Sequence, residues 1–229
     1  MKSIGSCVAA ILLLVDVSQA QVHIGLSGGV NFSGADQSSF YYSRAFSTTG
    51  YDIGGILDCP ITEHLSFLIE PTYVEKGTYA QPISFRGNVP KLSFDLSYFQ
   101  MPVLLKFSAG KDLKPYLLLG PSLGINLSSN VGAEISGPWF GQLEVMASAG
   151  NMVRDVECSI EFGGGLSYQV DEILTLFAEA RYARAINNTL KQGRLSVSVT
   201  NEMVEAGLPN NAVYRNKGFI VMAGFTLPL

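Results

Sequence analysis

Charged residues and long apolar runs are both scarce in this sequence, and together the two shortages narrow the fold class. Only 15% of the 229 residues are charged, whereas a soluble domain carries about 25%, so water is not expected to cover the whole surface. Helical membrane proteins need runs of about 20 apolar residues, and none follows residue 20. Yet 47% of the residues are hydrophobic. This combination favours transmembrane β-strands, in which apolar residues alternate with polar ones.

Residues for catalysis, metal binding and nucleic-acid binding are also few. The sequence has only two histidines, no repeated Cys/His/Asp spacing of a zinc site, and a formal net charge of −4. The glycine run at 163–165 lies in a β pattern, without the following helix that a phosphate cradle requires. We therefore predict no enzyme activity, no cofactor, no metal and no nucleic-acid partner.

The first 20 residues have the pattern of a secretory signal peptide. Lys2 precedes an apolar stretch at 8–15, and the small residues Ser18 and Ala20 precede the expected cleavage site. The apolar stretch is too short for a permanent membrane anchor. We expect two parts, a cleaved signal peptide at 1–20 and one outer-membrane β-barrel at 21–229.

Strict alternation of apolar and polar residues recurs along the mature chain. In the stretch at 115–128, Leu117, Leu119 and Leu123 share one parity, while Gly120 and Ser122 share the other. Eight such segments can be traced, most of them long enough to cross a bilayer: 22–33, 49–58, 65–76, 92–107, 115–128, 156–168, 174–183 and 218–227. The sequence therefore predicts an all-β fold, an eight-stranded antiparallel up-and-down transmembrane β-barrel.

The fourth segment changes parity along its length. Leu92, Phe94 and Leu96 alternate in one phase, whereas the apolar residues from Phe99 to Phe107 alternate in the other. A β-bulge near Ser97 and Tyr98 would add one residue to this strand and so place the apolar residues of both phases on the same face.

The connections alternate between long and short. Long ones are expected at 34–48, 77–91, 129–154 and 185–214, and short ones near 59–63, 108–114 and 170–173. Outer-membrane barrels have long extracellular loops and short periplasmic turns, so the N-terminus is expected in the periplasm. Residues 200–207 fit either a short capped helix or a flexible loop.

The apolar parity is expected to face lipid. A lipocalin-like carrier would turn its apolar face inward and expose the other, which should then be rich in lysine, glutamate and threonine. Here the second face is rich in glycine, serine and alanine, which fits the narrow interior of an eight-stranded barrel. Outward aromatic residues near strand ends indicate interfacial girdles: Phe32, Tyr51, Tyr73, Phe107, Tyr168, Tyr182 and Phe219.

Side chains that could react are placed apart by this topology. His23 and His64 map to the periplasmic ends of strands, where a capping or exposed role is favoured over catalysis. Cys59 and Cys158 map to opposite ends of the barrel, and a disulfide needs α-carbons within about 7 Å. We therefore expect both thiols to remain free.

Several charges share the inward parity and predict a network inside the barrel. Two registers about the turn at 170–173 are possible: one places Arg181 opposite Glu161, and the other places Arg181 opposite Gly163 and Glu179 opposite Gly165. In both registers the guanidinium can fork between carboxylates, and glycine provides space. The predicted network is structural and comprises Glu70, Lys106, Glu161, Glu179 and Arg181.

Six stretches in order resemble a known family: GLSGGVNFS, IEPTYVEKG, SYFQMPVLLKF, PYLLLGPSLGINL, EFGGGLSYQV and AEARYARAINN. Together they resemble the PorT-like outer-membrane β-barrel family of Bacteroidetes. The most specific element is the pattern of the fourth segment, Tyr98, Gln100, Pro102 and Lys106, in which Gln100 departs from the expected glutamate. The resemblance implies an eight-stranded barrel in a bacterial outer membrane. It implies less about function, because PorT itself is linked to secretion of surface proteases, whereas most relatives have no assigned role.

The leading functional hypothesis is a small barrel with a filled lumen, acting as a structural or interaction protein through its extracellular loops. The expected partners are outer-membrane lipid and proteins that bind the loops or the periplasmic turns. A small-solute pore and a lipid-modifying enzyme are the alternatives. A filled lumen argues against the pore, and the positions of the histidines argue against the enzyme.

Overall fold

The structure, a computed structural model, describes eight stretches of the chain. These are residues 21–37, 43–82, 89–137, 141–148, 153–191, 194–199, 202–207 and 214–229. The predicted signal peptide lies outside the described residues. Within the described stretches, no helix is long and apolar enough to cross a membrane.

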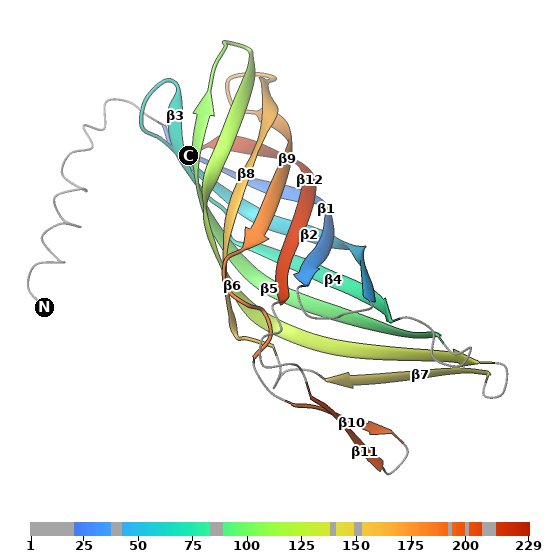
Figure 1. Ribbon diagram of the computed structural model, residues 1–229. Helices are drawn as coiled ribbons and strands as arrows, with labels where there is room; N and C mark the ends of the chain where they lie inside the picture. Colours follow the sequence, from blue (N-terminus) through green and yellow to red (C-terminus); the bar gives the residue numbers. More distant parts are fainter. Residues whose placement is uncertain are drawn as a thin grey trace, which may run out of the picture.

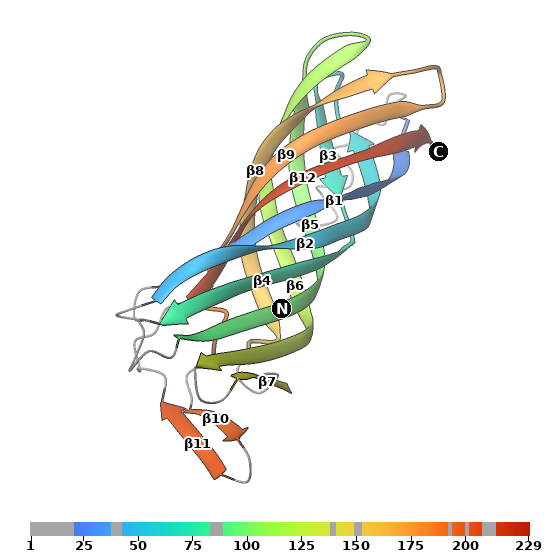
Figure 2. The same cartoon turned by 90° about the vertical axis from the view of Figure 1, so that its right-hand side faces the viewer.

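Antiparallel strands close into a ring of eight positions, which confirms the predicted fold class (Figures 1 and 2). The ring runs β1, β2, the pair β3/β4, β5, β6, β8, β9 and β12, and β12 pairs with β1 to close it. The strands are β1 His23–Gln37, β2 Ser43–Pro60, β3 Leu65–Ile69, β4 Thr72–Pro82, β5 Val89–Ser108, β6 Leu113–Gly137, β7 Gly141–Ser148, β8 Val156–Gln169, β9 Thr175–Ala185, β10 Arg194–Val199, β11 Glu202–Gly207 and β12 Tyr214–Pro228.

The third predicted strand is interrupted at Glu70 and Pro71. Both parts, β3 and β4, pair with β2 on one side and β5 on the other, so they fill one position of the ring. Proline has no N–H to donate to the ladder, but its carbonyl accepts from the Gly55 N–H at 3.0 Å. The Glu70 N–H donates to the Pro102 carbonyl at 3.1 Å, so hydrogen bonds continue across the break.

The β-bulge predicted within the fourth strand belongs to its neighbour. Between Ser97 and Tyr98 the pairing partner jumps from Ser128 to Asn126, so the extra residue is Leu127 of β6. Alternation along β5 is unbroken, and Phe94 and Leu96 are buried on the same face as Tyr98. The prediction was wrong because it assumed that every large apolar side chain faces lipid.

Short turns and long connections do alternate as predicted, but the strands extend further than expected. The short turns at 61–64, 109–112 and 170–174 lie with the C-terminus at one end, here called the turn end (Figures 1 and 2). At the opposite end, the loop end, β5 and β6 continue beyond the ring and β7 pairs with β6. Neither reading of 200–207 holds for the described residues 202–207: β11 pairs with β10 as a hairpin, in register Val197 to Val204.

The apolar parity faces outward, as predicted. In the stretch at 115–128, Leu117 and Leu119 are 67% and 59% exposed, whereas Leu118 and Ser122 are 3% and 2% exposed. The same division holds on β1, where Leu26 is exposed and Asn31 is buried. An apolar outer wall around a largely polar interior excludes the lipocalin-like arrangement.

Candidate functional site: the charged interior of the barrel

Arg181 is the centre of an ion-pair cluster inside the barrel. Its two terminal nitrogens fork to the Glu70 carboxylate, with Nη1 to Oε2 at 2.5 Å and Nη2 to Oε1 at 2.8 Å. Nη2 also pairs with Glu179, and Nη1 lies 3.8 Å from Glu161 Oε2. These four residues, here called the central cluster, are at most 5% exposed. One guanidinium therefore links carboxylates from the β3/β4 break, β8 and β9.

Glycines on the adjacent strand provide the space that the cluster occupies. The register places Gly163 opposite Arg181 and Gly165 opposite Glu179, which is the second of the two predicted alternatives. A Cβ at Gly165 would lie 2.6 Å from Glu179 Cβ and 2.6 Å from the Tyr116 hydroxyl. A larger residue at this position therefore cannot fit without displacing the acid or its partner.

Lys106, the fifth predicted member, has a different partner. Its Nζ pairs with Asp58 Oδ2 at 2.8 Å, near the turn end. The same Nζ lies 4.9 Å from the centroid of the Tyr116 ring, whose hydroxyl donates to Glu179 Oε2 at 2.7 Å. Tyr116 thus connects the Lys106 pair to the central cluster, although Lys106 and Arg181 share no carboxylate.

The predicted family motif lies on the inward face of β5. Tyr98, Gln100 and Pro102 are all buried, and Lys106 lies in phase with them. Gln100 Nε2 donates to Ser122 Oγ at 3.4 Å, and the Pro102 carbonyl accepts from the Glu70 N–H. The motif therefore supports the central cluster through the backbone of Glu70.

A second buried ion pair was missed by the sequence reasoning. Lys76 Nζ lies 2.6 Å from Glu157 Oε1, and Asn216 donates to the other oxygen of this carboxylate at 2.6 Å. Asp52 is also buried, at 3% exposed. The inward parity of Lys76, Glu157 and Asp52 was visible in the alternation, whereas Asn216 follows a stretch that was read as a loop.

Apolar side chains cross the interior near the loop end. They come from strands on several sides of the ring, and the rings of Phe94 and Tyr214 have centroids 5.7 Å apart. The cluster comprises Ala35, Val74, Phe94, Leu96, Tyr98, Val131, Val153, Leu190 and Tyr214. The interior therefore combines buried ion pairs with buried apolar clusters.

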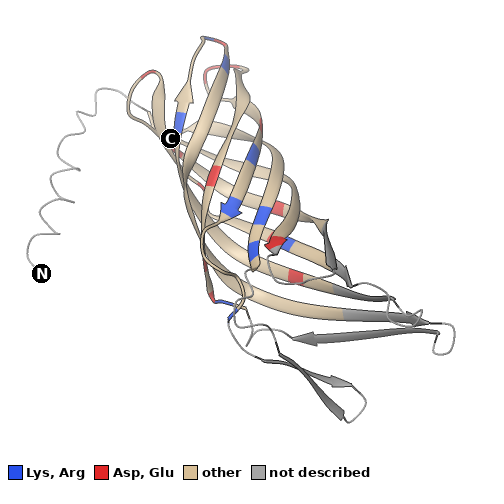
Figure 3. Cartoon of the chain, in the orientation of Figure 1, with Lys and Arg blue, Asp and Glu red and all other residues tan. Residues whose placement is uncertain are grey.

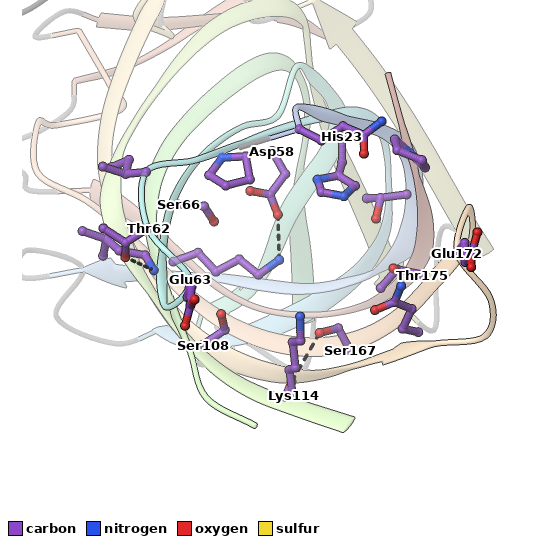
Figure 4. A pocket seen from close by; sticks show the side chains of 18 of the residues that line it. His23, Asp58, Thr62, Glu63, Ser66, Ser108, Lys114, Ser167, Glu172 and Thr175 are labelled. Carbon is purple, nitrogen blue, oxygen red and sulfur yellow. Dashed lines mark hydrogen bonds and ion pairs between the residues drawn. The ribbon is translucent and has the colours of Figure 1, made fainter. Parts of the chain in front are cut away.

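The turn end opens as a polar mouth of about 660 Å³ (Figure 4). His23, Asp58 and Lys114 point into it, and Asp58 accepts from Lys106. His64 lies instead in the exposed turn at 61–64, with its ring 6.3 Å from that of Phe107. The two histidines therefore do not meet. In the described part of the chain, no group of three or more His, Cys, Asp or Glu side chains could hold a metal ion.

A match to a known family decides the class of this barrel. The family model described as outer membrane protein beta-barrel domain matches residues 17–191. The chain belongs to this outer-membrane barrel family. Its localisation to the outer membrane follows from the family together with the barrel fold. No curated protein sequence matches the chain.

Solved structures of outer-membrane barrels are similar to this family member. The outer membrane protein OprG from Pseudomonas aeruginosa has a TM-score of 0.53 and 12% identity, covering 92% of this chain and 97% of OprG. Neisserial surface protein A has a TM-score of 0.39 and 15% identity, covering 90% and 97%. The outer membrane protease OmpT from Escherichia coli has a TM-score of 0.40 and 12% identity, covering 94% and 98%. At 12% identity, the similarity to OprG shows only a shared fold.

The thiols of the barrel lie in separate places. Cys59 pairs in register with Phe67 on β3, and Cys158 pairs with Leu123 on β6. Both are free cysteines and half-buried. Ion pairs and hydrogen bonds join different strands across the described interior.

Proposed function

We propose that the protein is a structural or interaction protein of the outer membrane, with a filled lumen and with its binding surfaces at the ends of the barrel. We also propose that it belongs to the PorT-like branch in Bacteroidetes and contributes to protein secretion. In this proposal the turn end and the processed N-terminus face the periplasm. The protein is not an enzyme, a pore or a nucleic-acid-binding protein.

The observation that carries the proposal is the central cluster. Its ion pairs join the β3/β4 position to β8 and β9 across the interior of an eight-stranded barrel, which is only wide enough for side chains to fill. The apolar cluster at the loop end supports the same conclusion, because packed apolar side chains offer no path for hydrated ions. A filled interior leaves the loops and turns as recognition surfaces.

The loop end supports an interaction role. β6 extends over 25 residues, β7 pairs with it, and the β10–β11 hairpin lies at the same end (Figures 1 and 2). These elements project more backbone than three short turns provide at the opposite end. Protein partners are expected to contact this extension first.

Planar-bilayer recording tests the filled lumen. The purified protein should give no large steady conductance, because the ion pairs and the apolar cluster close the bore. Arg181→Gly removes the central ion pairs and should give a higher conductance than Leu117→Gly, which changes only the outer wall. Reproducible ion-selective steps of porin size from the unaltered protein would establish the pore instead.

Crosslinking in intact cells tests the interaction role and the orientation. A photoreactive residue at Ser198 in the hairpin should crosslink to a protein partner at the loop end. A second photoreactive residue, at Glu172 in the turn at 170–174, tests for protein partners on the periplasmic side. An impermeant thiol reagent should label Ser198→Cys in intact cells and Glu172→Cys only after the outer membrane is opened, in a background lacking Cys59 and Cys158. The absence of protein crosslinks in both arms would contradict an interaction role.

A further inference from the structure

A row of aromatic side chains runs across four neighbouring strands on the outer wall of the barrel. Phe32 on β1 pairs in register with Phe219 on β12, which pairs with Tyr182 on β9, which pairs with Phe162 on β8. Phe32, Phe219 and Phe162 are exposed, and the Phe162 and Tyr182 rings have centroids 5.5 Å apart. Aromatic belts of this kind lie at the boundary between hydrocarbon and headgroups.

Cationic side chains occupy the next outward positions toward the loop end. Lys217 on β12 pairs in register with Arg184 on β9, and one step further Arg215 pairs with Asp36 on β1. The blue segments of β9 and β12 lie side by side in Figure 3. Arg184 and Lys217 are 58% and 41% exposed, so their charged groups reach the surface.

One carboxylate, that of Asp36, pairs with two of these three cations. Asp36 Oδ1 lies 2.6 Å from Lys217 Nζ, and Asp36 Oδ2 lies 2.9 Å from Arg184 Nη2. Arg215 has no ion-pair partner among the described residues. The patch, here called the basic patch and defined as Arg184, Lys217, Arg215 and Asp36, therefore carries two positive charges in excess.

Among the described side chains, the basic patch is a local feature of the wall. On β4 and β5, the outward charges among the described side chains near the loop end are Glu75 and Asp95, which are acidic. Cations kept only for general interfacial solubility would be spread around the ring. Their concentration on β9 and β12, beside Asp36 of β1, indicates an anionic ligand on that side.

We propose that the basic patch binds the phosphate group of a membrane lipid headgroup. A phosphate offers several acceptor oxygens, and an arginine fork beside a lysine matches them. The acyl chains would lie along the outward column of Phe219, Val221 and Ala223, directly below the cations on β12. A soluble anion would gain nothing from that column, so the ligand is a lipid. Because headgroups of both leaflets carry phosphate, this inference does not depend on the orientation proposed above.

Lipid retention in non-ionic detergent, measured by native mass spectrometry on the full chain, tests the proposal. The probes are phosphatidic acid, diacylglycerol with the same acyl chains, and inorganic phosphate. The barrel should retain phosphatidic acid in preference to diacylglycerol. In the double variant Arg184→Gln with Lys217→Gln, phosphatidic acid retention should fall about 25-fold, because each cation contributes about fivefold. Lys191→Gln removes an exposed cation that pairs with Asp155 rather than with Asp36, and it should change nothing.

Asp36→Asn gives a second test that does not depend on removing cations. The carboxylate competes with the phosphate for Arg184 and Lys217, so its neutralisation should raise phosphatidic acid retention by about fivefold. A heat-modifiable band establishes that each variant is folded before it is compared. Unchanged retention in the double variant, lower retention in Asp36→Asn, or inorganic phosphate binding as tightly as phosphatidic acid would overturn the proposal.

Discussion

Replacing Arg181 by methionine should destabilise the barrel strongly. The substitution keeps an unbranched side chain but removes the only cation in contact with Glu70, Glu161 and Glu179 among the described residues. Arg181 and its partners are at most 5% exposed, so water cannot replace the lost contacts. Breaking one buried ion pair by removing one partner costs about 3–5 kcal/mol, and here three carboxylates lose the same partner. The expected loss is therefore at the upper end of that range.

The assay is denaturant unfolding of the detergent-folded protein, followed by circular dichroism and by the mobility shift on unheated gels. Arg184→Met is the matched control, because it changes the same residue type on the same strand. Its side chain is 58% exposed, and an exposed ion pair contributes at most about 1 kcal/mol. Adding Glu70→Gln to Arg181→Met should recover part of the stability, since one uncompensated buried charge is removed. Equal unfolding of Arg181→Met and the unaltered protein would refute the reasoning.

Three further outcomes are expected. The purified protein should run as a compact, heat-modifiable band and resist protease in detergent outside the four long connections; a folded, monodisperse protein in plain buffer would contradict a membrane barrel. Gly165→Ala should lower the yield of folded barrel because its Cβ would meet side-chain atoms at 2.6 Å, whereas Gly28→Ala, with open space around its Cβ, should fold normally. Tyr116→Phe removes a buried hydrogen bond to a carboxylate and should cost about 1–3 kcal/mol in unfolding experiments, whereas Tyr168→Phe on the outer wall should cost almost nothing.

The barrel could be predicted from the sequence because alternation reports directly on which face of a strand is apolar. Leu117 and Leu119 alternate with Leu118 and Gly120 in one unbroken phase, and the structure keeps this phase. The prediction from alternation was wrong at Phe94 and Leu96, since an apolar side chain in a barrel can lie on either face of its strand. It can face lipid, or it can join an apolar layer inside, and local pattern does not distinguish them.

The central cluster could be predicted in part for the same reason. The inward parity of Arg181, Glu161 and Glu179 was visible, but two registers remained because a turn of uncertain length shifts the pairing by two residues. The pairing of Lys106 with Asp58 was not predicted, since it joins β5 to β2 and depends on the position of the β3 hairpin. Likewise, the Lys76 and Glu157 pair crosses the interior between β4 and β8, which are not neighbours in the ladder.

The closure of the ring by β1 and β12 constrains the order in which the molecule can be made. His23 pairs with Pro228, so β1 obtains its second neighbour only from β12. Until synthesis is complete, β1 has one open backbone edge, and bilayer hydrocarbon offers nothing to bond with it. Contacts between distant parts of a chain also form slowly. A chain truncated before Tyr214 should therefore leave this edge of β1 unpaired and remain unable to close the ring.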